Sequence, residues 1–340
     1  MTIQAAVLGA SGYSGGELIR LLMSHSEFEV SALFANAQAG EKLSNVHPQF
    51  AGSPHEFKNV ADIDLNEFEI IFFALPAGVS GALLKDQELK AHYIDLGADY
   101  RLLAKKDWQD FYPGKYSGVW TYGLPELKGQ REVIKKSRFI ANPGCYATAA
   151  ALGILPAAQS KVIDEEVISI VAASGTTGAG RSLKPNLLHS EASNNLSAYR
   201  VGGLHQHIPE IEQTINQSEP GKFKVSFIPI LAPMPRGILL TINFKTSKKI
   251  ENLHSLYCDY YKNENFIQIL DAGLAPNTRA LQGSNAAHIA IYKDSRTSQA
   301  QIVVAIDNLG KGAAGQAIQN ANLIFGLPED SGLSSLGMGS

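Results

Sequence analysis

The chain has 340 residues, of which 45% are hydrophobic and 18% are charged. A chain of this length and composition can bury a large core, which excludes a wholly disordered protein and predicts one large or two ordinary domains. The 29 basic and 32 acidic residues give a formal net charge of −3. Because there is no basic excess, we expect neither nucleic-acid binding nor attachment to an anionic membrane surface.

The apolar runs and the cysteines argue against a membrane-spanning protein and against a disulfide-rich or zinc-thiolate protein. The longest apolar stretches, such as Ile70–Val79, are about half a membrane span, and the first residues form a strand-like run without a cationic signal region. The two cysteines, Cys145 and Cys258, are too few for a disulfide framework or a thiolate zinc site. These features predict a cytoplasmic protein. Cys258 lies in the helical stretch Leu253–Tyr261, where we expect a buried, inert thiol.

The first half of the chain alternates short β-branched or aromatic runs with helical patterns. Helices are predicted at Gly16–Met23 and Val79–Lys90, where leucines recur at helical spacing. Strands are predicted at Ile3–Leu8, Val30–Phe34, Ile70–Leu75, Tyr93–Leu96 and Phe139–Ala141. This alternation is typical of parallel βαβ units, so the fold class is α/β, beginning with a Rossmann-type dinucleotide-binding domain.

The pattern changes after about Gly144. A helix is predicted to run through Ala158, and longer strands follow at Val167–Ala173, Val225–Leu231, Gly237–Phe244, His288–Tyr292 and Gln301–Asp307. This predicts a second, α+β domain with a large mixed sheet. The Gly/Ser-rich end, Ser331–Ser340, is expected to fray.

A glycine-rich motif follows the first predicted strand and precedes the first helix. It reads Gly9-Ala10-Ser11-Gly12-Tyr13-Ser14-Gly15. Glycines there let backbone N–H groups approach a pyrophosphate, which the positive end of the helix stabilises. Because strand and helix flank the motif, it predicts a dinucleotide site.

The end of the second strand bears on the choice of dinucleotide. NAD-preferring Rossmann folds carry an acidic residue there for the ribose 2′-OH, whereas this chain reads Ala35-Asn36-Ala37-Gln38. Since no carboxylate would repel a 2′-phosphate, and Asn36, Gln38 or Lys42 could bind one, the sequence favours NADP over NAD.

Cys145 lies in the segment Asn142-Pro143-Gly144-Cys145. Asn is a good N-cap and Pro is favoured at the first helical position, so we expect a helix to begin here with Cys145 in its first turn. The N–H groups and the dipole at a helix N-terminus favour a thiolate over a thiol. The pattern therefore predicts a nucleophilic cysteine with a pKa below that of a free thiol.

Two further segments could serve such a nucleophile. His205 and His207 would face the same way on an extended backbone, with Glu210 close by to orient one imidazole. No third or fourth ligand accompanies them, which disfavours a metal site. The loop Ser174–Arg181 follows a strand and offers backbone donors, hydroxyls and an arginine, which suit an oxyanion or a phosphate.

These motifs together resemble the N-acetyl-γ-glutamyl-phosphate reductase family, which is similar in architecture to aspartate-semialdehyde dehydrogenase. The resemblance runs from Ile3 to about Leu327 and includes two further motifs, Pro233–Gly237 and Asp307–Ala317. It implies an NADP-binding domain of residues 1–143 and 309–340. The catalytic and oligomerisation domain would be residues 144–308, in a homo-oligomer, either a dimer or a tetramer.

The resemblance also implies a reaction. Cys145 would attack a small-molecule acyl phosphate and expel phosphate, NADPH would reduce the resulting thioester, and the product would be N-acetylglutamate 5-semialdehyde. His205 or His207 would act as acid and base, with His205 favoured. No metal is implied.

Site residues follow by position in the motifs. The implied substrate-binding residues are Arg101, Asn142, Ser174, Gly175, Arg181, Glu210 and Arg236. The implied cofactor-binding residues are Gly9, Ser11, Gly12, Tyr13, Ser14, Gly15, Asn36, Gln38, Leu75, Pro76, Gly178 and Asn308.

Two positions depart from the family pattern. Many members carry an arginine near the position of Asn36, and many carry a serine where this chain has Gly97. One alternative is a sister reductase acting on aspartyl phosphate or on a carrier-linked aminoadipyl phosphate. The other is a nucleotide-sensing module without turnover, for which Cys145 would be incidental.

Overall fold

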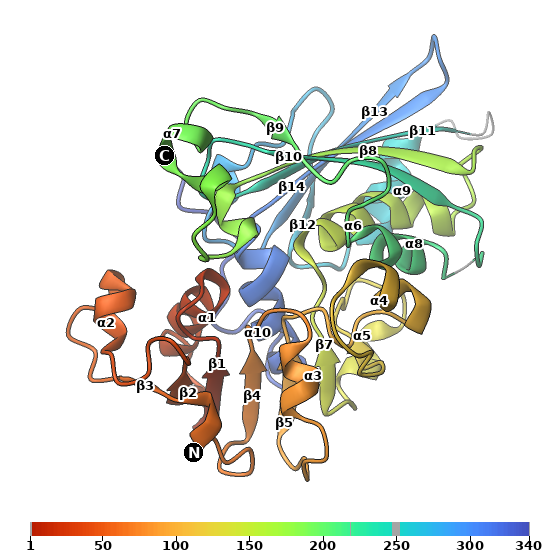
Figure 1. The fold of residues 1–340 in the computed structure, drawn as a ribbon. Coiled ribbons are helices and arrows are strands. Elements are labelled where there is room, and N and C mark those ends of the chain that lie inside the picture. Colours follow the sequence, from red (N-terminus) through yellow and green to blue (C-terminus); the bar gives the residue numbers. More distant parts are fainter. Residues whose placement is uncertain (1, 218, 247–251, 340) are drawn as a thin grey trace. The chain divides into compact units, whose positions relative to one another are not determined.

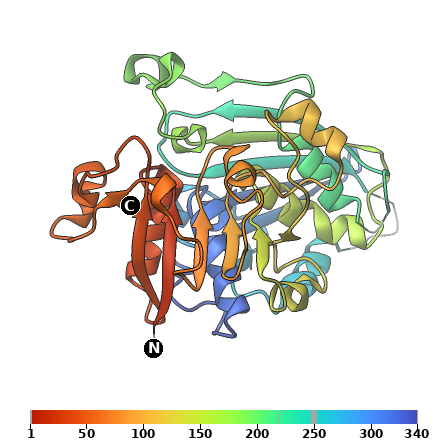
Figure 2. The ribbon, with the colours of Figure 1, turned by 60° about the horizontal axis from the view of Figure 1, so that its bottom comes forward.

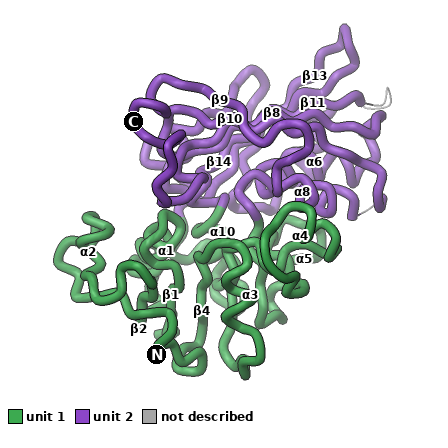
Figure 3. The backbone as a smooth tube through the Cα atoms, viewed as in Figure 1, with its two compact units in different colours: residues 1–143, 313–333 green, residues 144–312, 334–340 purple. Residues whose placement is uncertain are grey.

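The computed structural model describes residues 2–217, 219–246 and 252–339. The chain divides into two compact units (Figure 3). Unit 1 comprises Met1–Pro143 and Ala313–Leu333, and unit 2 comprises Gly144–Gly312 and Ser334–Ser340. The chain therefore returns to unit 1 at Ala313 rather than at residue 309, and its last residues belong to unit 2.

Unit 1 is built on a parallel sheet whose strand order is β3-β2-β1-β4-β5-β7-β6. Its described strands are β1 (Ile3–Leu8), β2 (Phe28–Phe34), β3 (Phe57–Lys58), β4 (Ile70–Phe73), β5 (His92–Asp95), β6 (Thr121–Tyr122) and β7 (Phe139–Ala141). The order reverses between β1 and β4, which is the switch point at which dinucleotide-binding folds hold their ligand. The predicted Rossmann-type domain is confirmed, although the short strands β3 and β6 carry no sequence pattern long enough to predict.

Helices connect the strands of this sheet, and some of them lie against it (Figure 1). They are α1 (Tyr13–Met23), α2 (Leu43–Val46), α3 (Val79–Leu83), α4 (Lys105–Phe111), α5 (Gln130–Ile134) and α10 (Gly315–Ile324). In α1, Leu18, Ile19 and Leu22 are buried against the β1–β2 side of the core. The predicted helix Val79–Lys90 is wrong beyond Leu83, because Leu84 closes α3 and Asp86 adopts a positive φ of 61°.

Helix α10 carries an unusual number of buried amides, all within unit 1. Gln319 Nε2 donates to Glu126 Oε1 at 3.1 Å and to Glu329 Oε1 at 2.7 Å. Asn320 Nδ2 donates to the Gly123 carbonyl at 2.9 Å. Such bonds satisfy polar groups that would otherwise be costly to bury, and they fix α10 on the sheet.

Unit 2 is built on a mixed sheet with the order β12-β13-β14-β11-β8-β10-β9, whose strands lie side by side in Figure 2. Its described strands are β8 (Val167–Ser174), β9 (Ser197–Ala198), β10 (Lys224–Leu231), β11 (Ile238–Lys245), β12 (Ile267–Ile269), β13 (Ala287–Asp294) and β14 (Gln299–Ile306). Antiparallel pairs join β8, β11, β14 and β13, whereas β8 and β10 are parallel. This confirms the predicted large mixed sheet.

One face of this sheet packs on helices α6 (Cys145–Gln159), α8 (Ile208–Ile215) and α9 (Leu253–Tyr261); a short helix, α7 (His189–Ala192), lies in an exposed segment. Helix α6 is apolar almost all round and lies close to the strands. A Cβ on Gly153 would lie 2.4 Å from Ile242 Cδ1 and 2.9 Å from Val304 Cγ2. Glycine is therefore required where the α6 backbone meets the sheet.

The C-terminal residues are held rather than frayed. Asn322 Nδ2 donates to the Ser331 carbonyl at 2.8 Å. The N–H of Asn285 donates to the Ser334 carbonyl at 2.8 Å, and the N–H of Met338 donates to the Gln282 carbonyl at 2.9 Å. The expectation of fraying is thus wrong for residues 331–339, since contacts with distant segments replace local structure.

Candidate active site

The glycine-rich loop of unit 1 joins β1 to α1 in a conformation that needs its glycines. Gly9 has φ +79°, and a Cβ there would lie 2.2 Å from the Ala74 carbonyl oxygen. A Cβ on Gly15 would lie 2.4 Å from the Gly9 carbonyl oxygen, and Gly12 is the N-cap residue of α1. The first turn of α1, which includes Tyr13, presents N–H groups that have no partner within the helix. This cradle fits a pyrophosphate.

At the carboxyl end of β2, Asn36 is exposed and Gln38 is half-buried. Asn36 Oδ1 accepts the N–H of Val60 at 3.3 Å, so the side chain also connects this end of β2 to the segment after β3. The Ala35 N–H donates to the carbonyl of Lys58, the last residue of β3. The end of β2, where the sequence predicts a preference for NADP over NAD, is therefore a hydrogen-bonded corner rather than an open loop.

Two predicted anion-site residues of unit 1 have protein partners. Buried Arg101 donates through Nε to the Asn142 carbonyl and through Nη2 to the Leu96 carbonyl, both at 2.7 Å. Asn142 Nδ2 donates to the Ala313 carbonyl at 3.0 Å, and its Oδ1 accepts from Asn320 at 3.1 Å. These bonds fix both side chains in place at the end of β7, directly before the cysteine segment.

The loop after β4, which contains half-buried Leu75 and exposed Pro76, is followed by a segment held by two buried carboxylates. Asp99 accepts the N–H groups of Gly78 and Gly81 at 2.6 and 2.8 Å. Asp95 Oδ1 accepts from the Ser80 hydroxyl at 2.9 Å. Burial, reinforced by the charge of Asp99 and opposed by that of Arg101, raises the pKa of Asp95 to about 7.

In unit 2, Cys145 is the first residue of α6, and its thiol is not part of a disulfide. The predicted cap is wrong: Gly144 rather than Asn142 is the N-cap residue, because the Asn142 side chain is engaged elsewhere. The Gly144 N–H donates to Oε1 of fully buried Glu210 at 2.8 Å. A Cβ on Gly312 would lie 2.8 Å from Cys145 Cβ. Glu210 and Gly312 thus fix the position of Cys145.

The two predicted histidines lie together beside the residue that follows Cys145. The ring centroids of His205 and His207 are 5.0 Å apart, and they lie 5.4 and 5.8 Å from that of Tyr146. The extended backbone on which the two imidazoles would face the same way is not found, since His207 is helical at φ −82° and ψ −9° and precedes α8.

Buried His205 is neutral at pH 7. Burial lowers its pKa to about 2, with a smaller contribution from the positive charges of His207 and Arg200 and an opposing one from Glu210. The His207 N–H donates to His205 Nδ1 at 3.2 Å, which leaves the proton of the neutral ring on Nε2.

Two tyrosines that the sequence patterns do not single out complete this cluster. The hydroxyls of Tyr146 and Tyr199 are 3.1 Å apart, and the Tyr199 ring lies 5.7 Å from that of His205. Burial raises the pKa of both tyrosines, that of Tyr199 to about 12, and the charge of Cys145 contributes in the same direction. A tyrosine directly after the cysteine was the only available signal for this cluster.

The loop Ser174–Arg181 is predicted to offer its backbone N–H groups to an anion, but three of these groups have partners within the protein. The N–H groups of Gly175, Thr176 and Thr177 donate to the carbonyls of Gly237, Met234 and Pro235. These backbone donors are therefore used within the protein. A Cβ on Gly178 would lie 3.1 Å from Oγ of buried Ser174, while Arg181 is exposed.

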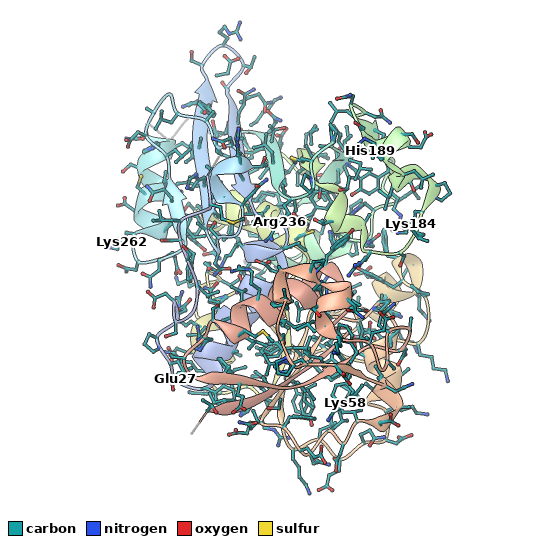
Figure 4. The ribbon with its side chains drawn as sticks, turned by 90° about the vertical axis from the view of Figure 1, so that its left-hand side faces the viewer. Glu27, Lys58, Lys184, His189, Arg236 and Lys262 are labelled. Carbon is teal, nitrogen blue, oxygen red and sulfur yellow. The ribbon has the colours of Figure 1, made fainter. Side chains whose placement is uncertain are left out.

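Arg236 and Asn308 have partners within unit 2. Arg236 forms an ion pair with fully buried Asp307, with Nη2 2.7 Å from Oδ2 and Nε donating to Oδ1 at 3.1 Å. Figure 4 labels Arg236 among the strands, well inside the exposed Lys184 and His189. Asn308 Oδ1 accepts the Gly237 N–H at 2.7 Å, and Nδ2 donates to Thr177 at 2.9 Å.

Comparison with known proteins places this arrangement in a family. Residues 4–137 match a profile described as semialdehyde dehydrogenase, NAD binding domain, and residues 145–308 match semialdehyde dehydrogenase, dimerisation domain. An N-acetyl-gamma-glutamyl-phosphate reductase of Acidothermus cellulolyticus is 46% identical, and one of Frankia casuarinae is 45% identical, each over 99% of both chains. The chain belongs to the N-acetyl-gamma-glutamyl-phosphate reductase family.

Solved structures share the fold of this reductase family. Aspartate semialdehyde dehydrogenase II of Vibrio cholerae, complexed with ASA, matches with a TM-score of 0.72 at 18% identity, covering 96% of this chain and 98% of that one. Aspartate semialdehyde dehydrogenase of Candida albicans with NADP matches with a TM-score of 0.71 at 18% identity, over 96% and 99%. At these identities the likeness shows the fold alone.

The described residues of this family member contain neither a membrane-spanning helix nor a metal-binding cluster. None of its described helices is long and apolar enough to cross a membrane. No group of three or more His, Cys, Asp or Glu side chains that could hold a metal ion occurs in the described part of the chain.

Proposed function

We propose that this protein reduces N-acetyl-γ-glutamyl phosphate to N-acetylglutamate 5-semialdehyde and phosphate in arginine biosynthesis. The observation that carries the proposal is Cys145, a thiol at the start of α6 and directly before Tyr146, whose ring lies 5.4 Å from that of the neutral, buried His205. The full-length relatives named as N-acetyl-gamma-glutamyl-phosphate reductases support the substrate.

The chain's own residues account for the covalent steps. The Cys145 thiolate attacks the γ-carbonyl carbon, the C–O bond to phosphate breaks, and a thioester remains on the sulfur. The N-terminal end of α6 stabilises the thiolate before attack and after release. When bound, the reduced nicotinamide supplies the hydride that converts the thioester to a thiohemiacetal.

The histidine pair is proposed as the acid and base that acts on the tetrahedral oxyanion. We favour His205, whose neutral ring keeps its proton on Nε2 and can donate a hydrogen bond from it to that oxyanion. The carbonyl then re-forms as the C–S bond breaks, which releases the aldehyde and restores the thiolate. Arg101, Arg181 and Arg236 are the candidate contacts for the anionic groups of the substrate.

Unit 1 is proposed to hold the dinucleotide. The Gly9–Gly15 loop would hold the pyrophosphate, Asn36 and Gln38 would contact the adenosine ribose, and Leu75 and Pro76 would contact the nicotinamide portion. Gly178 and Asn308 are the candidate cofactor contacts of unit 2. NADP is the proposed cofactor, because Ala35–Gln38 offers no carboxylate to repel a 2′-phosphate.

We also propose a cytoplasmic homo-oligomer, a dimer or a tetramer, that forms through unit 2. One face of its sheet packs on α6, α8 and α9, whereas the opposite face presents a row of partly exposed side chains on four adjacent strands. The row is Val303, Thr241, Val171 and Ile228, which pair in register. A mostly apolar row of this kind is typical of an interface between subunits.

The test runs the reaction in reverse. The purified protein is mixed with N-acetylglutamate semialdehyde, phosphate and either NADP or NAD, and formation of the reduced nicotinamide is followed by absorbance. We expect phosphate-dependent reduction of NADP that falls by ~1,000-fold or more in Cys145→Ala. Cys258→Ala is the matched control, because Cys258 lies in α9 and burial raises the pKa of its thiol.

Three outcomes would contradict parts of this proposal. Full activity in Cys145→Ala would exclude a thioester on that sulfur. Activity with aspartate semialdehyde alone would keep the mechanism and change the substrate to that of a sister reductase. Binding of a nucleotide without turnover of either aldehyde would favour a sensor.

A further inference from the structure

We propose that His47 is a positioning residue for the dinucleotide: it holds the Gly9–Gly15 loop in the conformation that receives the pyrophosphate. The inference rests on the proposed function, because it concerns the cofactor loop of unit 1. No sequence motif pointed to His47, which lies outside the βαβ pattern in a segment between β2 and β3.

A hydrogen bond joins His47 to the loop. Its Nε2 lies 2.9 Å from the carbonyl oxygen of Ala10, in the middle of the glycine-rich motif, and the histidine is 6% exposed. Because a carbonyl can only accept, Nε2 carries the proton and donates it. Because a buried carbonyl without a donor is unfavourable, this bond favours one loop conformation over others.

A close packing contact joins the same ring to the first turn of α1. A Cβ on Gly16 would lie 2.5 Å from His47 Cε1 and 2.8 Å from His47 Nδ1. The imidazole therefore occupies the space that a side chain at position 16 would need. Gly16 lies within α1, so no turn of the backbone requires a glycine there. It is required because a side chain at this position would keep the histidine from reaching the loop.

Backbone hydrogen bonds hold the other side of the loop. The N–H groups of Gly9 and Ala10 both donate to the Phe34 carbonyl of β2, at 3.0 and 3.1 Å, and the Gly12 N–H donates to the Gly9 carbonyl at 3.1 Å. These bonds fix where the loop leaves β1. His47 acts on the Ala10 carbonyl, which lies between that anchor and the N-terminus of α1.

The segment that carries His47 is itself well held. The His47 N–H donates to the Leu43 carbonyl at 2.9 Å, and the Phe50 N–H donates to the His47 carbonyl at 3.0 Å. The rings of His47 and Phe50 meet edge to face, with centroids 6.1 Å apart. The residue that holds the glycine-rich loop therefore belongs to a hydrogen-bonded segment. Support from an ordered segment of this kind preorganises a binding site.

The experiment measures the dissociation constant of NADPH by quenching of protein fluorescence and by calorimetry, so that it does not depend on turnover. We expect His47→Ala to raise this constant about tenfold or more, with kcat at saturating NADPH close to that of the wild type. His47→Gln keeps a donor at a similar reach and is expected to restore most of the affinity. Alkylation of Cys145 in the absence of NADPH reports whether unit 2 remains intact.

His55→Ala is the matched control. His55 belongs to the same segment, and its Nε2 lies 3.0 Å from the Val30 carbonyl of β2, away from the glycine-rich loop. It should leave the dissociation constant of NADPH within about twofold of the wild-type value. Both His47→Ala and His55→Ala can lower the melting temperature. The positioning role is supported if only His47→Ala also binds NADPH more weakly.

The proposal and the function on which it rests fail differently. If the wild type binds neither NADPH nor NADH, the proposed function fails. If the wild type binds NADPH and folded His47→Ala binds it equally well, the positioning role alone is overturned. If His47→Ala does not fold, His47→Gln is compared with Gly16→Ala, whose methyl group displaces the His47 ring. A folded Gly16→Ala must then bind NADPH more weakly than His47→Gln. Equal affinities of the two variants would overturn the positioning role.

Discussion

Asn36 is a neutral residue at the carboxyl end of β2, where a carboxylate would favour NAD, and a single substitution tests its role. Asn36→Asp introduces a carboxylate that can accept from a ribose 2′-OH and repels a 2′-phosphate. The new Oδ1 can still accept the Val60 N–H, so the corner should stay folded. We expect the ratio of kcat/KM for NADP to that for NAD to fall by about tenfold or more.

Asn59→Asp is the control for this change. Asn59 is exposed and accepts the Ala61 N–H at 2.9 Å, a similar bond in the same corner. It adds the same charge without placing it at the end of β2. An equal loss of NADP preference in both variants, or no loss in Asn36→Asp, would mean that the 2′-phosphate does not bind at Asn36.

Asp95 gives unit 1 a dependence on pH. Its pKa is about 7 in the folded protein and 3.8 in the reference state, so the folded form keeps a proton that the unfolded form releases between these values. Its contribution to stability is therefore full below about pH 4 and is lost as the pH rises through 7.

Asp95→Asn removes this titration while keeping an oxygen for the Ser80 hydroxyl. The change in the free energy of unfolding between pH 5 and pH 8, measured by urea titration, should be smaller in the variant than in the wild type. Asp62→Asn, at an exposed site, should leave that change unaltered. A wild-type-like pH dependence in Asp95→Asn would show that other groups cause it.

At the scale of elements, α6 contains a proline that removes one of its own hydrogen bonds. Pro156 has no N–H to donate to the Leu152 carbonyl one turn earlier. The Tyr261 hydroxyl of α9 donates to that carbonyl instead, at 2.7 Å. The cost of the proline is thus offset by a contact between two helices.

This pairing predicts a double-mutant result. Tyr261→Phe leaves the Leu152 carbonyl without its donor and should lower the free energy of unfolding by about 1–3 kcal/mol. Pro156→Ala restores a backbone donor, so Tyr261→Phe should cost less in the Pro156→Ala background. Additive effects in a chemical-denaturation cycle would show that the two groups do not share the carbonyl.

At the scale of the whole molecule, the sheet of unit 2 is expected to be an interface between copies of the chain. Thr241 lies inside the row of partly exposed side chains, paired with Val171 on one side and Val303 on the other. Thr241→Arg places a charge where a partner would pack and should convert the protein to monomers, as measured by light scattering after gel filtration. Gln268→Arg on the edge strand β12 is the control. An unchanged mass for Thr241→Arg would move the interface elsewhere.

Local patterns in the sequence were sufficient to predict the longer strands, the start of α6 and the types of the two sheets. β1 begins and ends at the residues predicted, Ile3 and Leu8, and α6 carries Cys145 in its first turn. The alternation of strands and helices predicted a parallel sheet followed by a mixed one. These features are readable because helix and strand periods and the preferences of Gly, Pro and Cys act within a few residues. The assignments of individual site residues stay predictions.

Only the tertiary structure decided which side chains meet. Asn142 is not a helix cap because Ala313 and Asn320, far along the chain, use its amide, and Glu210 fixes Gly144 although 66 residues separate them. His47 reaches the glycine-rich loop in the same way. Such contacts depend on strand order and on burial, which bring distant residues together and leave no periodic trace in the sequence. The amino-acid sequence therefore determined the elements and their chemistry, and the packing decided their partners.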